Sequence, residues 1–411
     1  MGIRPDDAPS GPEVSIFMSM TAVKAKGLTM LGDWAPGPCR LDARIPHGEV
    51  TVMNIEGPIL ARDHGLAPSP KAGPSLAHFQ APDELKPGAA VLANNHVMDY
   101  GAAGLHATLD ALSSRGWQVV GAGDDLAAAC RPTHIEVDGR RIAVIAAAEK
   151  QFGAAAGRPG FAPCGPWLHE AIRRADDDAD AVLVSAHGGA ETCPWPSPDR
   201  QALYRSWIDA GAAIVHGHHA HVPQGIETYG DGLITYGLGN FAVDPSAWRD
   251  DASTRWSLVV HVEQLAPLEW TTDFVGVTAT GEGEARVAPL DDPARHDACA
   301  HLQRCSAPLA DPDLLAAAWQ SSAMRLFDDY GRGFLGWNVR SATASVLQAV
   351  MQRPGVSNGW MSARDRVRYH ALACDAHREV AETALGVLTG EVPDRRNDDS
   401  ERLVEEMMPR R

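Results

Sequence analysis

Residues 212–244 read AAIVHGHHAHVPQGIETYGDGLITYGLGNFAVD and combine two apolar runs with an unusual concentration of histidine. The first run ends in four histidines within six positions, namely His216, His218, His219 and His221. In extended backbone, His219 and His221 point to one side, so both can reach the metal atoms of one cluster. His216 and His218 alternate with them and are expected to point the other way. A lone histidine after a strand is usually structural, whereas this cluster indicates a metal site.

Polar residues also end other apolar runs of the chain. An isolated Asp or Asn at such a place often caps a turn. Five strand ends that carry Asp, Glu, Asn and His are instead expected to converge on one metal site. Besides the histidine cluster, the residues concerned are Asp33 in LGDW, Glu56 in MNIEGP, Asn95-His96 in VLANNH, and His187 in VLVSAHGG.

Apolar runs alternate with helix-like segments, which predicts an α/β fold of layered mixed β-sheets flanked by helices. The segment His134–Ala147 reads as a hairpin with Asp138-Gly139 as its turn. Helices are expected at Ala102–Arg115, Pro166–Asp176 and Pro198–Ala210. Strands are expected at Leu28–Leu31, Val50–Ile55, Ala89–Ala93, Gln118–Val120, Ile142–Ala146, Ala181–Ser185, Ala213–Val215 and Leu233–Tyr236, with antiparallel additions at Ser257–Leu265 and Trp270–Val277.

Beyond residue 290 the character of the chain changes. The stretch DDPARHDACAHLQRCSAPLADPD reads as a linker, and apolar residues at helical spacing follow it. The helical C-terminal extension is a candidate cap, dimerisation module or packing element. Its helices are expected at Asp313–Tyr330, Val339–Gln352 and Ala363–Thr389. The predicted divisions are an N-terminal segment (1–26), a main domain (27–285), a linker (286–311) and the helical C-terminal region (312–411).

The composition is that of an ordinary globular protein, with 45% hydrophobic residues in a chain of 411. The formal charge of −17 opposes binding to nucleic acid or to an anionic membrane, because phosphate groups would be repelled. The first thirty residues lack the apolar core of a secretory signal, and no segment reaches the roughly 20 apolar residues of a membrane span. We therefore expect a cytoplasmic protein without a membrane anchor. The seven cysteines include no CxxC pair, which argues against a disulfide framework or a zinc knuckle.

Short blocks follow one another in order along the main domain. They are GD at Gly32-Asp33, NIEGPI at Asn54–Ile59, ANNHVMDYGAAGLHATLDAL at Ala93–Leu112, GAG at Gly121–Gly123, HGGAE at His187–Glu191, GHHAHVPQ at Gly217–Gln224 and YGLGNF at Tyr236–Phe241. A single block would mean little, whereas the ordered series is specific. The series resembles the CapA family of capsule and poly-γ-glutamate biosynthesis proteins. That family's fold is similar to the calcineurin-like metallophosphoesterase fold, so this resemblance implies the same layered architecture.

The resemblance also implies a site for one or two divalent metal ions. The mixed carboxylate, amide and imidazole donors suit Mn, Fe, Zn or Co. The metallophosphoesterase pattern begins with Asp-x-His, and Ala35 stands at its third position, so one ligand of the pattern is missing. One tight cation site with a second weak site is therefore the alternative to two full sites. The ligands that the resemblance implies are Asp33, Glu56 as the bridging carboxylate, Asn95, His187, His219 and His221.

Two residues near the third block are candidates for catalysis. His96 matches the family residue that contacts the substrate or protonates the leaving group. Asp99, three residues further on, either orients the imidazole of His96 through a hydrogen bond or caps the helix that starts near Gly101.

Three polar residues, Asn54, Glu191 and Asn240, are candidates for substrate binding. Each also has a structural interpretation. Asn54 is expected to tie down backbone beside Glu56 rather than to bind metal. Glu191 is equally well explained as a surface carboxylate, and Asn240 as the organiser of the loop beside the histidines.

These roles predict a metal-dependent hydrolase, in which activated water attacks a phosphoester or an amide such as a γ-glutamyl bond. Its partner would be a small-molecule or γ-glutamyl-type substrate, and the C-terminal helices are a candidate surface for a homo-oligomer. One alternative is a non-hydrolytic accessory to capsule or poly-γ-glutamate assembly, which the acidic charge disfavours because a polyanion would be repelled. A tailoring enzyme of a small-molecule pathway on the same scaffold is another. Analogy of fold does not choose among these alternatives.

Overall fold

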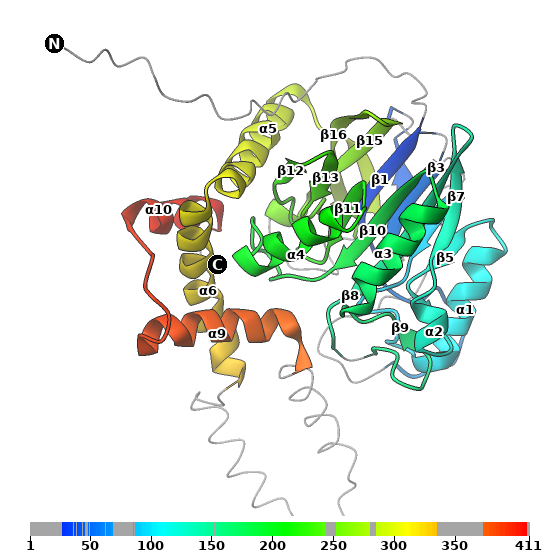
Figure 1. Cartoon of the computed structure of the whole chain (residues 1–411), viewed down its shortest axis with the longest axis horizontal. Helices are drawn as coiled ribbons and strands as arrows, with labels where there is room; N and C mark the ends of the chain where they lie inside the picture. Colours follow the sequence, from blue (N-terminus) through cyan, green and yellow to red (C-terminus); the bar gives the residue numbers. More distant parts are fainter. Residues whose placement is uncertain are drawn as a thin grey trace, which may run out of the picture.

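The computed structural model describes residues 27–68, 85–243, 252–279, 285–334 and 373–408, apart from positions 36, 38, 43, 46, 47, 49, 62, 86 and 152. Two β-sheets lie against each other at its centre, with helices around them (Figure 1). Apolar residues from both sheets belong to one core, so the sheets form two packed layers. The predicted α/β fold with layered mixed sheets is confirmed.

Within the described ranges, the larger sheet has nine strands in the order β2-β17-β16-β15-β1-β3-β4-β5, with β14 paired to β1 outside this path. Strands β1, β3, β4 and β5 are parallel to one another, and β15, β16 and β17 extend the sheet in antiparallel fashion. The bounds are β1 Leu28–Trp34, β2 Cys39–Leu41, β3 Val50–Ile55, β4 Pro87–Val91, β5 Gln118–Val120, β14 Asn240–Ala242, β15 Trp256–Leu265, β16 Leu268–Ala279 and β17 Ala285–Pro289.

The second sheet has the order β12-β13-β11-β10-β8-β7 across the residues described. Strands β8, β10, β11 and β13 are parallel, and β7 and β12 pair antiparallel at the two edges. The β7–β8 pair is the predicted hairpin, and Asp138 in its turn has a φ of 51°. The bounds are β7 Thr133–Val137, β8 Arg140–Ala148, β10 Ala181–His187, β11 Ile214–His218, β12 Ile226–Tyr229 and β13 Gly232–Thr235, with a separate small pair β6 Ala122–Gly123 and β9 Gly160–Phe161.

The second sheet is buried on both faces, as its continuous apolar strands predict. In β8, Ile142 and Val144 belong to the core between the sheets, whereas Ala143 and Ile145 belong to the core under the helices. This alternation follows from the two-residue period of a strand. The second sheet therefore has one face against the larger sheet and the other against helices.

One helix of the main domain, α4, begins at a clear side-chain cap. Ser197 accepts a hydrogen bond from the backbone N–H of Arg200 at 3.1 Å, and Pro198 occupies the first helical position of α4. The predicted helices of this domain are confirmed. Their bounds are α1 Gly101–Ser113, α2 Leu126–Ala129, α3 Trp167–Asp178 and α4 Pro198–Asp209, with a short 3₁₀ helix η1 at Ala252–Thr254.

The predicted linker at 286–311 is wrong as a description of local structure. It contains α5 (Asp292–Ser306) and the 3₁₀ helix η2 (Ala307–Ala310). Asp291 caps α5 by accepting a hydrogen bond from the backbone N–H of Ala294 at 3.0 Å. Ala298 and Leu302 lie one turn apart and are buried in the core between the sheets. These apolar residues are few, so the polar composition of the segment hid its helical pattern.

The C-terminal extension contains α6 (Pro312–Phe334), α9 (Asp375–Thr389) and α10 (Asp398–Met407), which pack together (Figure 1). Trp319 on α6 donates its indole N–H to Thr383 on α9 at 3.0 Å. The helical character predicted for 313–330 and for the end of 363–389 is confirmed. The predicted helix at Val339–Gln352 and the segment 1–26 lie outside the described residues. The domain boundaries stay predictions.

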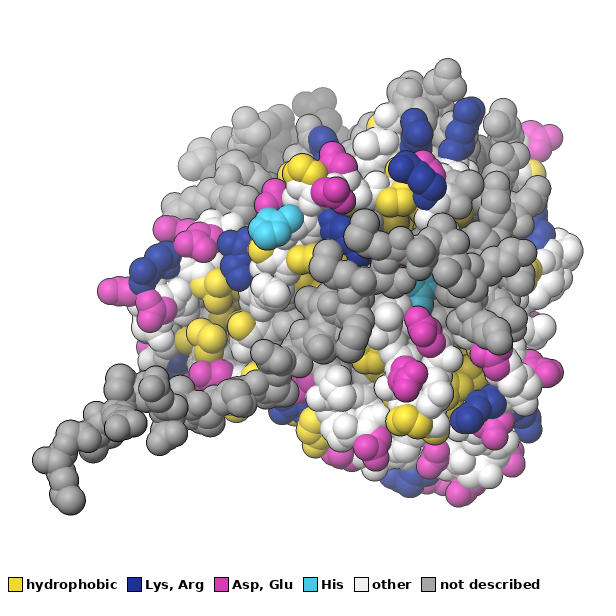
Figure 2. Space-filling model, turned by 90° about the horizontal axis from the view of Figure 1, so that it is seen from above, with side chains coloured by type: hydrophobic (Ala, Val, Ile, Leu, Met, Phe, Trp, Pro, Cys, Tyr) yellow, Lys and Arg dark blue, Asp and Glu magenta, His cyan; other side chains and the backbone are white. Residues whose placement is uncertain are grey.

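The described surface carries both signs of charge. Figure 2 shows acidic side chains distributed over the described part of one face, with basic side chains between them. On the described part of this face, the acidic side chains are therefore not confined to one patch. Among the described residues, no helix combines the length and apolar character that crossing a membrane requires.

Gly217 in β11 allows a close approach of backbone beside the candidate site. A Cβ atom added there would lie 2.1 Å from the carbonyl oxygen of Tyr236. We expect Gly217→Ala to lower the free energy of unfolding by about 1–3 kcal/mol, because the two backbone segments must move apart. Gly37→Ala is the matched control, since the nearest atom to its added Cβ is 4.0 Å away. Denaturant unfolding of both variants checks this, and equal stability would contradict the close packing at Gly217.

Candidate metal centre

The predicted metal ligands converge at one edge of the two sheets. Asp33 lies in β1 beside Asn54 of β3 on one side and Asn240 of β14 on the other. His187 ends β10, and the histidine cluster follows from the neighbouring strand β11. Because these strands are parallel, their carboxyl ends meet at the same edge. The structure therefore brings together the set predicted from the strand ends, which is Asp33, Glu56, Asn95, His187, His219 and His221.

Asp33 makes several hydrogen bonds across the site. Its Oδ1 lies 2.8 Å from Nδ1 of His218 and accepts a hydrogen bond from Nδ2 of Asn54 at 2.9 Å. Its Oδ2 accepts the backbone N–H of His219 at 3.2 Å. These contacts hold the carboxylate, which is 1% exposed, in one orientation between the sheets.

His218 was predicted to point away from the site, and this prediction is wrong. The prediction assumed extended backbone through His221, but β11 ends at His218. His219 has a φ of 88° and His221 a φ of 58°, so both adopt the left-handed conformation. The two-residue alternation therefore stops, and His218, His219 and His221 all reach the site. The ring of His216 lies next to that of His218, with centroids 4.1 Å apart, but its Nε2 lies 3.0 Å from the carbonyl oxygen of Leu31.

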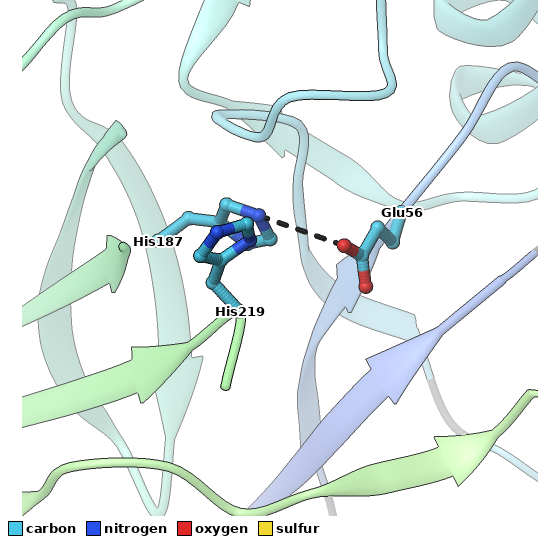
Figure 3. Close-up of side chains that lie close together, drawn as sticks. All are labelled: Glu56, His187 and His219. Carbon is cyan, nitrogen blue, oxygen red and sulfur yellow. Dashed lines mark ion pairs between the residues drawn. The ribbon is translucent and has the colours of Figure 1, made fainter. Parts of the chain in front are cut away.

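Glu56 faces histidines from two neighbouring strand ends. Its Oε1 lies 3.6 Å from Nε2 of His187 and 3.5 Å from Nε2 of His221. Figure 3 shows His187 and His219 together on one side, with the carboxylate of Glu56 directed towards them. His187 Nε2 also lies 3.0 Å from Oδ1 of Asn95. This arrangement places one carboxylate between nitrogen donors, as a bridging ligand requires.

His221 is oriented by Asn240. Nδ1 of His221 lies 2.9 Å from Oδ1 of Asn240, and the amide nitrogen of Asn240 donates to the carbonyl oxygen of Thr254 at 3.2 Å. The same Nδ1 is 3.6 Å from Oδ2 of Asp33. The geometry thus matches the prediction that Asn240 organises the surroundings of the histidines.

The donor set fits divalent cations. Three groups, each with ligand atoms within 4.8 Å of one another, are Glu56–His187–His219, Asp33–Glu56–His221 and Glu191–His219–His221. Nδ1 of His219 and Nε2 of His218 are buried and have no hydrogen-bond partner among the described residues. Buried nitrogen lone pairs beside carboxylates are the donors that Mn, Fe, Zn and Co bind. The residues present therefore fit the metal ions that the sequence implies.

The protonation states also suit cation binding. Burial by itself would raise the pKa of Asp33, but the hydrogen bond and charge of His218, with the charges of His221 and His187, hold this pKa well below its usual range. Burial lowers the pKa of His187 well below its usual value and lowers the pKa of His219 to about 3. Near neutral pH, Asp33 is a carboxylate and these two imidazoles are neutral. Those are the forms in which Asp and His bind metals.

Asp99 contacts His96, as one of its two predicted roles requires. Nδ1 of His96 lies 2.7 Å from Oδ2 of Asp99, and both side chains are buried. The capping role is wrong, because Tyr100 is the residue before α1 and no side chain caps that helix. The hydrogen bond fixes the orientation of the His96 ring.

Asn94 is a site residue that sequence reasoning missed. Its Oδ1 accepts the backbone N–H groups of His96 at 3.1 Å and Val97 at 2.9 Å. Its Nδ2 donates to Oδ1 of Asn54 at 3.0 Å and to the carbonyl oxygen of Ile55 at 2.7 Å. The two adjacent asparagines, Asn94 and Asn95, were the sequence feature that could have indicated this role. The first holds the loop through hydrogen bonds, and the second lies 3.0 Å from His187.

Asn54 was expected to bond backbone or to contact substrate. Instead, the side chain of Asn54 forms hydrogen bonds with the side chains of Asp33 and Asn94. Its Nδ2 also lies 3.3 Å from Nδ1 of His187. Asn54 is 0% exposed, so its side chain cannot reach solvent and instead holds the side chains of Asp33 and His187 in position. Glu191, in contrast, is partly exposed and lies with His219 and His221.

Comparison with known proteins gives one family. The family model described as "Bacterial capsule synthesis protein PGA_cap" matches residues 33–245. The capsule biosynthesis protein CapA of Bacillus anthracis is 36% identical over 178 residues, covering 41% of this chain and 43% of that protein. A probable polyglutamine synthesis accessory protein of Mycobacterium tuberculosis is 32% identical over 259 residues, covering 54% of this chain and 66% of that protein. The chain spans less than half the length of the Bacillus relative.

One solved structure is similar to part of this chain. It is a phosphatase from Mycoplasma pneumoniae, with 13% sequence identity, 66% of this chain and 96% of that chain covered, and a TM-score of 0.35. At this TM-score the likeness carries no argument about activity.

We expect Glu56→Gln and His219→Ala to lose bound cation while keeping the fold, because both side chains lie at strand ends and contribute donor atoms. Mn²⁺ should raise the unfolding temperature of the wild type and fail to raise that of either variant. Elemental analysis after loading measures the metal content directly. His169→Ala is the control, since this partly buried histidine bonds Ser206 on α4 at 2.9 Å and should leave metal content unchanged. Wild-type metal content in Glu56→Gln or His219→Ala would place the cation elsewhere.

Proposed function

The chain belongs to the family of bacterial capsule synthesis proteins, and within that family we propose that it is a metal-dependent hydrolase. The observation that carries the proposal is the position of Glu56, whose Oε1 faces Nε2 of both His187 and His221 at 3.6 and 3.5 Å. A carboxylate shared between nitrogen donors is the arrangement used to hold two cations side by side. The proposed substrate is a phosphoester or a γ-glutamyl-type amide.

The cations would be held by Asp33, Glu56, Asn95, His187, His219 and His221. When bound, divalent cations acidify water and stabilise the negative charge that develops on a phosphorus or carbonyl centre. The protein residues supply rigidity, because Asp33 and His221 are each fixed by neighbouring side chains. Rigid donors need no reorganisation during the reaction.

His96 is the proposed proton donor to the leaving group. Asp99 holds Nδ1 of its ring at 2.7 Å, which makes Nε2 the atom that exchanges a proton with the substrate. The charge of His96 acts on the pKa of His219, so the two rings share one electrostatic environment. The proposed proton donor would therefore lie near the cation ligands, where a leaving group would emerge.

A non-hydrolytic accessory role is the second candidate. It is favoured by the names of the relatives, one of which is called a probable synthesis accessory protein and another a capsule biosynthesis protein. In that role the same cation site would bind a polymer end without cleaving it. A tailoring role in a small-molecule pathway, cytoplasmic residence and a homo-oligomer through the C-terminal helices stay predictions.

A substrate screen distinguishes the two candidate functions. Protein loaded with Mn²⁺ or Zn²⁺ is assayed against aryl and alkyl phosphoesters and against γ-glutamyl amides, with Glu56→Gln as the inactive control. Metal-dependent turnover of one class supports the hydrolase. If the wild type binds metal and turns over neither class, the accessory role replaces it.

His96→Ala should reduce turnover much more than metal affinity, because His96 is placed as a proton donor. General acid catalysis typically contributes about 10²- to 10⁴-fold, and we expect a loss in that range on substrates with poor leaving groups. The loss should shrink on an aryl leaving group that needs little protonation. Asp99→Asn, which keeps the shape of the contact, should show a smaller loss of the same kind.

Metal stoichiometry and turnover are measured on the same preparations of His96→Ala. A large metal loss would make His96 a ligand. Unchanged turnover on a poor leaving group would remove it from the reaction.

A further inference from the structure

Glu191 lies in the loop that follows β10, and its carboxylate lies beside the histidine pair. Ligand atoms of Glu191, His219 and His221 lie within 4.8 Å of one another. Glu191 is partly exposed, whereas Asp33 and Glu56 are each 1% exposed. Glu191 is thus the carboxylate on the solvent side of the two imidazoles.

The unsatisfied ring nitrogen of His219 supports a direct role for this carboxylate. Nδ1 of His219 is buried and has no hydrogen-bond partner within the described part of the chain. A buried nitrogen without a partner is costly, and a cation shared with a nearby carboxylate satisfies it.

The loop that carries Glu191 is held against the histidine segment by backbone hydrogen bonds. The N–H of Gly188 donates to the carbonyl oxygen of His218 at 3.3 Å, and that of Thr192 donates to Ala220 at 2.8 Å. Thr192 has a φ of 61°, a left-handed conformation that is strained in a residue other than glycine. Such strain persists only where the surroundings impose it. The contacts of the loop therefore fix the position of Glu191 opposite His219 and His221.

A third contact fixes the same loop from the other side. Oε1 of Glu149 accepts the backbone N–H of Gly189 at 3.1 Å and forms an ion pair with Arg200. Glu149 is 4% exposed, so this support is buried. Glu191 therefore sits on a loop anchored both to β8 and to the histidine segment.

We infer that Glu191 is a further ligand of the divalent metal centre, acting together with His219 and His221. The inference rests on the proposed function for the existence of that centre. Because His219 and His221 also belong to the two groups that contain Glu56, Glu191 would add a ligand to the same centre rather than hold a separate metal ion. Its negative charge offsets part of the excess positive charge that two divalent cations leave beside the carboxylates of Asp33 and Glu56.

Calorimetric titration of the metal-free protein with Mn²⁺ tests this inference. Glu191→Gln should weaken Mn²⁺ binding by about tenfold or more, since even a supporting partner of a metal ligand typically contributes 10- to 100-fold. Glu191→Asp, which keeps a carboxylate, should recover part of the affinity. Glu170→Gln is the control, because it makes the same charge change on the exposed surface of α3 and should bind Mn²⁺ as the wild type does.

Co²⁺ absorption supplies a second readout, since the spectrum changes when a ligand is lost. The unfolding temperature of metal-free Glu191→Gln should equal that of the wild type, which separates a ligand role from a structural one. Unchanged Mn²⁺ affinity and an unchanged Co²⁺ spectrum in Glu191→Gln would overturn the inference and leave the proposed function standing. A wild-type protein that binds no Mn²⁺ would overturn both.

Discussion

The carboxylate of Asp33 joins the two sheets, and the geometry of the whole site depends on this contact. Asp33 belongs to β1 of the larger sheet, and His218, 2.8 Å away, ends β11 of the second sheet. Asn54 and the backbone of His219 bind the same carboxylate. A buried charge is tolerated only when it is fully hydrogen-bonded, so these partners are a condition for folding as well as for the site. These contacts hold the end of β1 in one sheet close to the end of β11 in the other.

Close backbone approach is the second requirement of this arrangement. Gly32 stands next to Asp33, and a Cβ atom there would lie 2.1 Å from the carbonyl oxygen of Gly239. A Cβ atom on Gly217 would likewise lie 2.1 Å from the carbonyl oxygen of Tyr236. Beyond these glycines the chain turns sharply, and His219 and His221 take up left-handed conformations that direct both rings inward. The site thus combines tight strand packing with local backbone strain, which the surrounding hydrogen bonds maintain.

The C-terminal extension contributes to the same region from outside the matched family segment. Glu379 on α9 accepts a hydrogen bond from Ser197 and lies 3.6 Å from the guanidinium of Arg200, which also pairs with Glu149. Asp375 at the start of α9 accepts the backbone N–H of Lys150 at 3.0 Å. Because Glu149 holds the loop after His187, the helix and the loop are linked through one partly buried set of hydrogen bonds and ion pairs. The extension is therefore a support of the site as well as a packing element.

The sequence by itself determined the layered α/β fold, the strand ends and the residues proposed as metal ligands, because apolar runs of fixed period and polar residues at their ends are local features. It also identified Asn240 and Asp99 as neighbours of histidines. Only the tertiary structure decided how those residues meet. His218 joins Asp33 because the strand ends at His218 instead of continuing to His221, and Asn54 and Asn94 act on side chains from other segments. The helix α5 depended on burial against distant strands. Contacts between segments far apart in the chain leave no periodic trace in the sequence, which is why these features required the folded molecule.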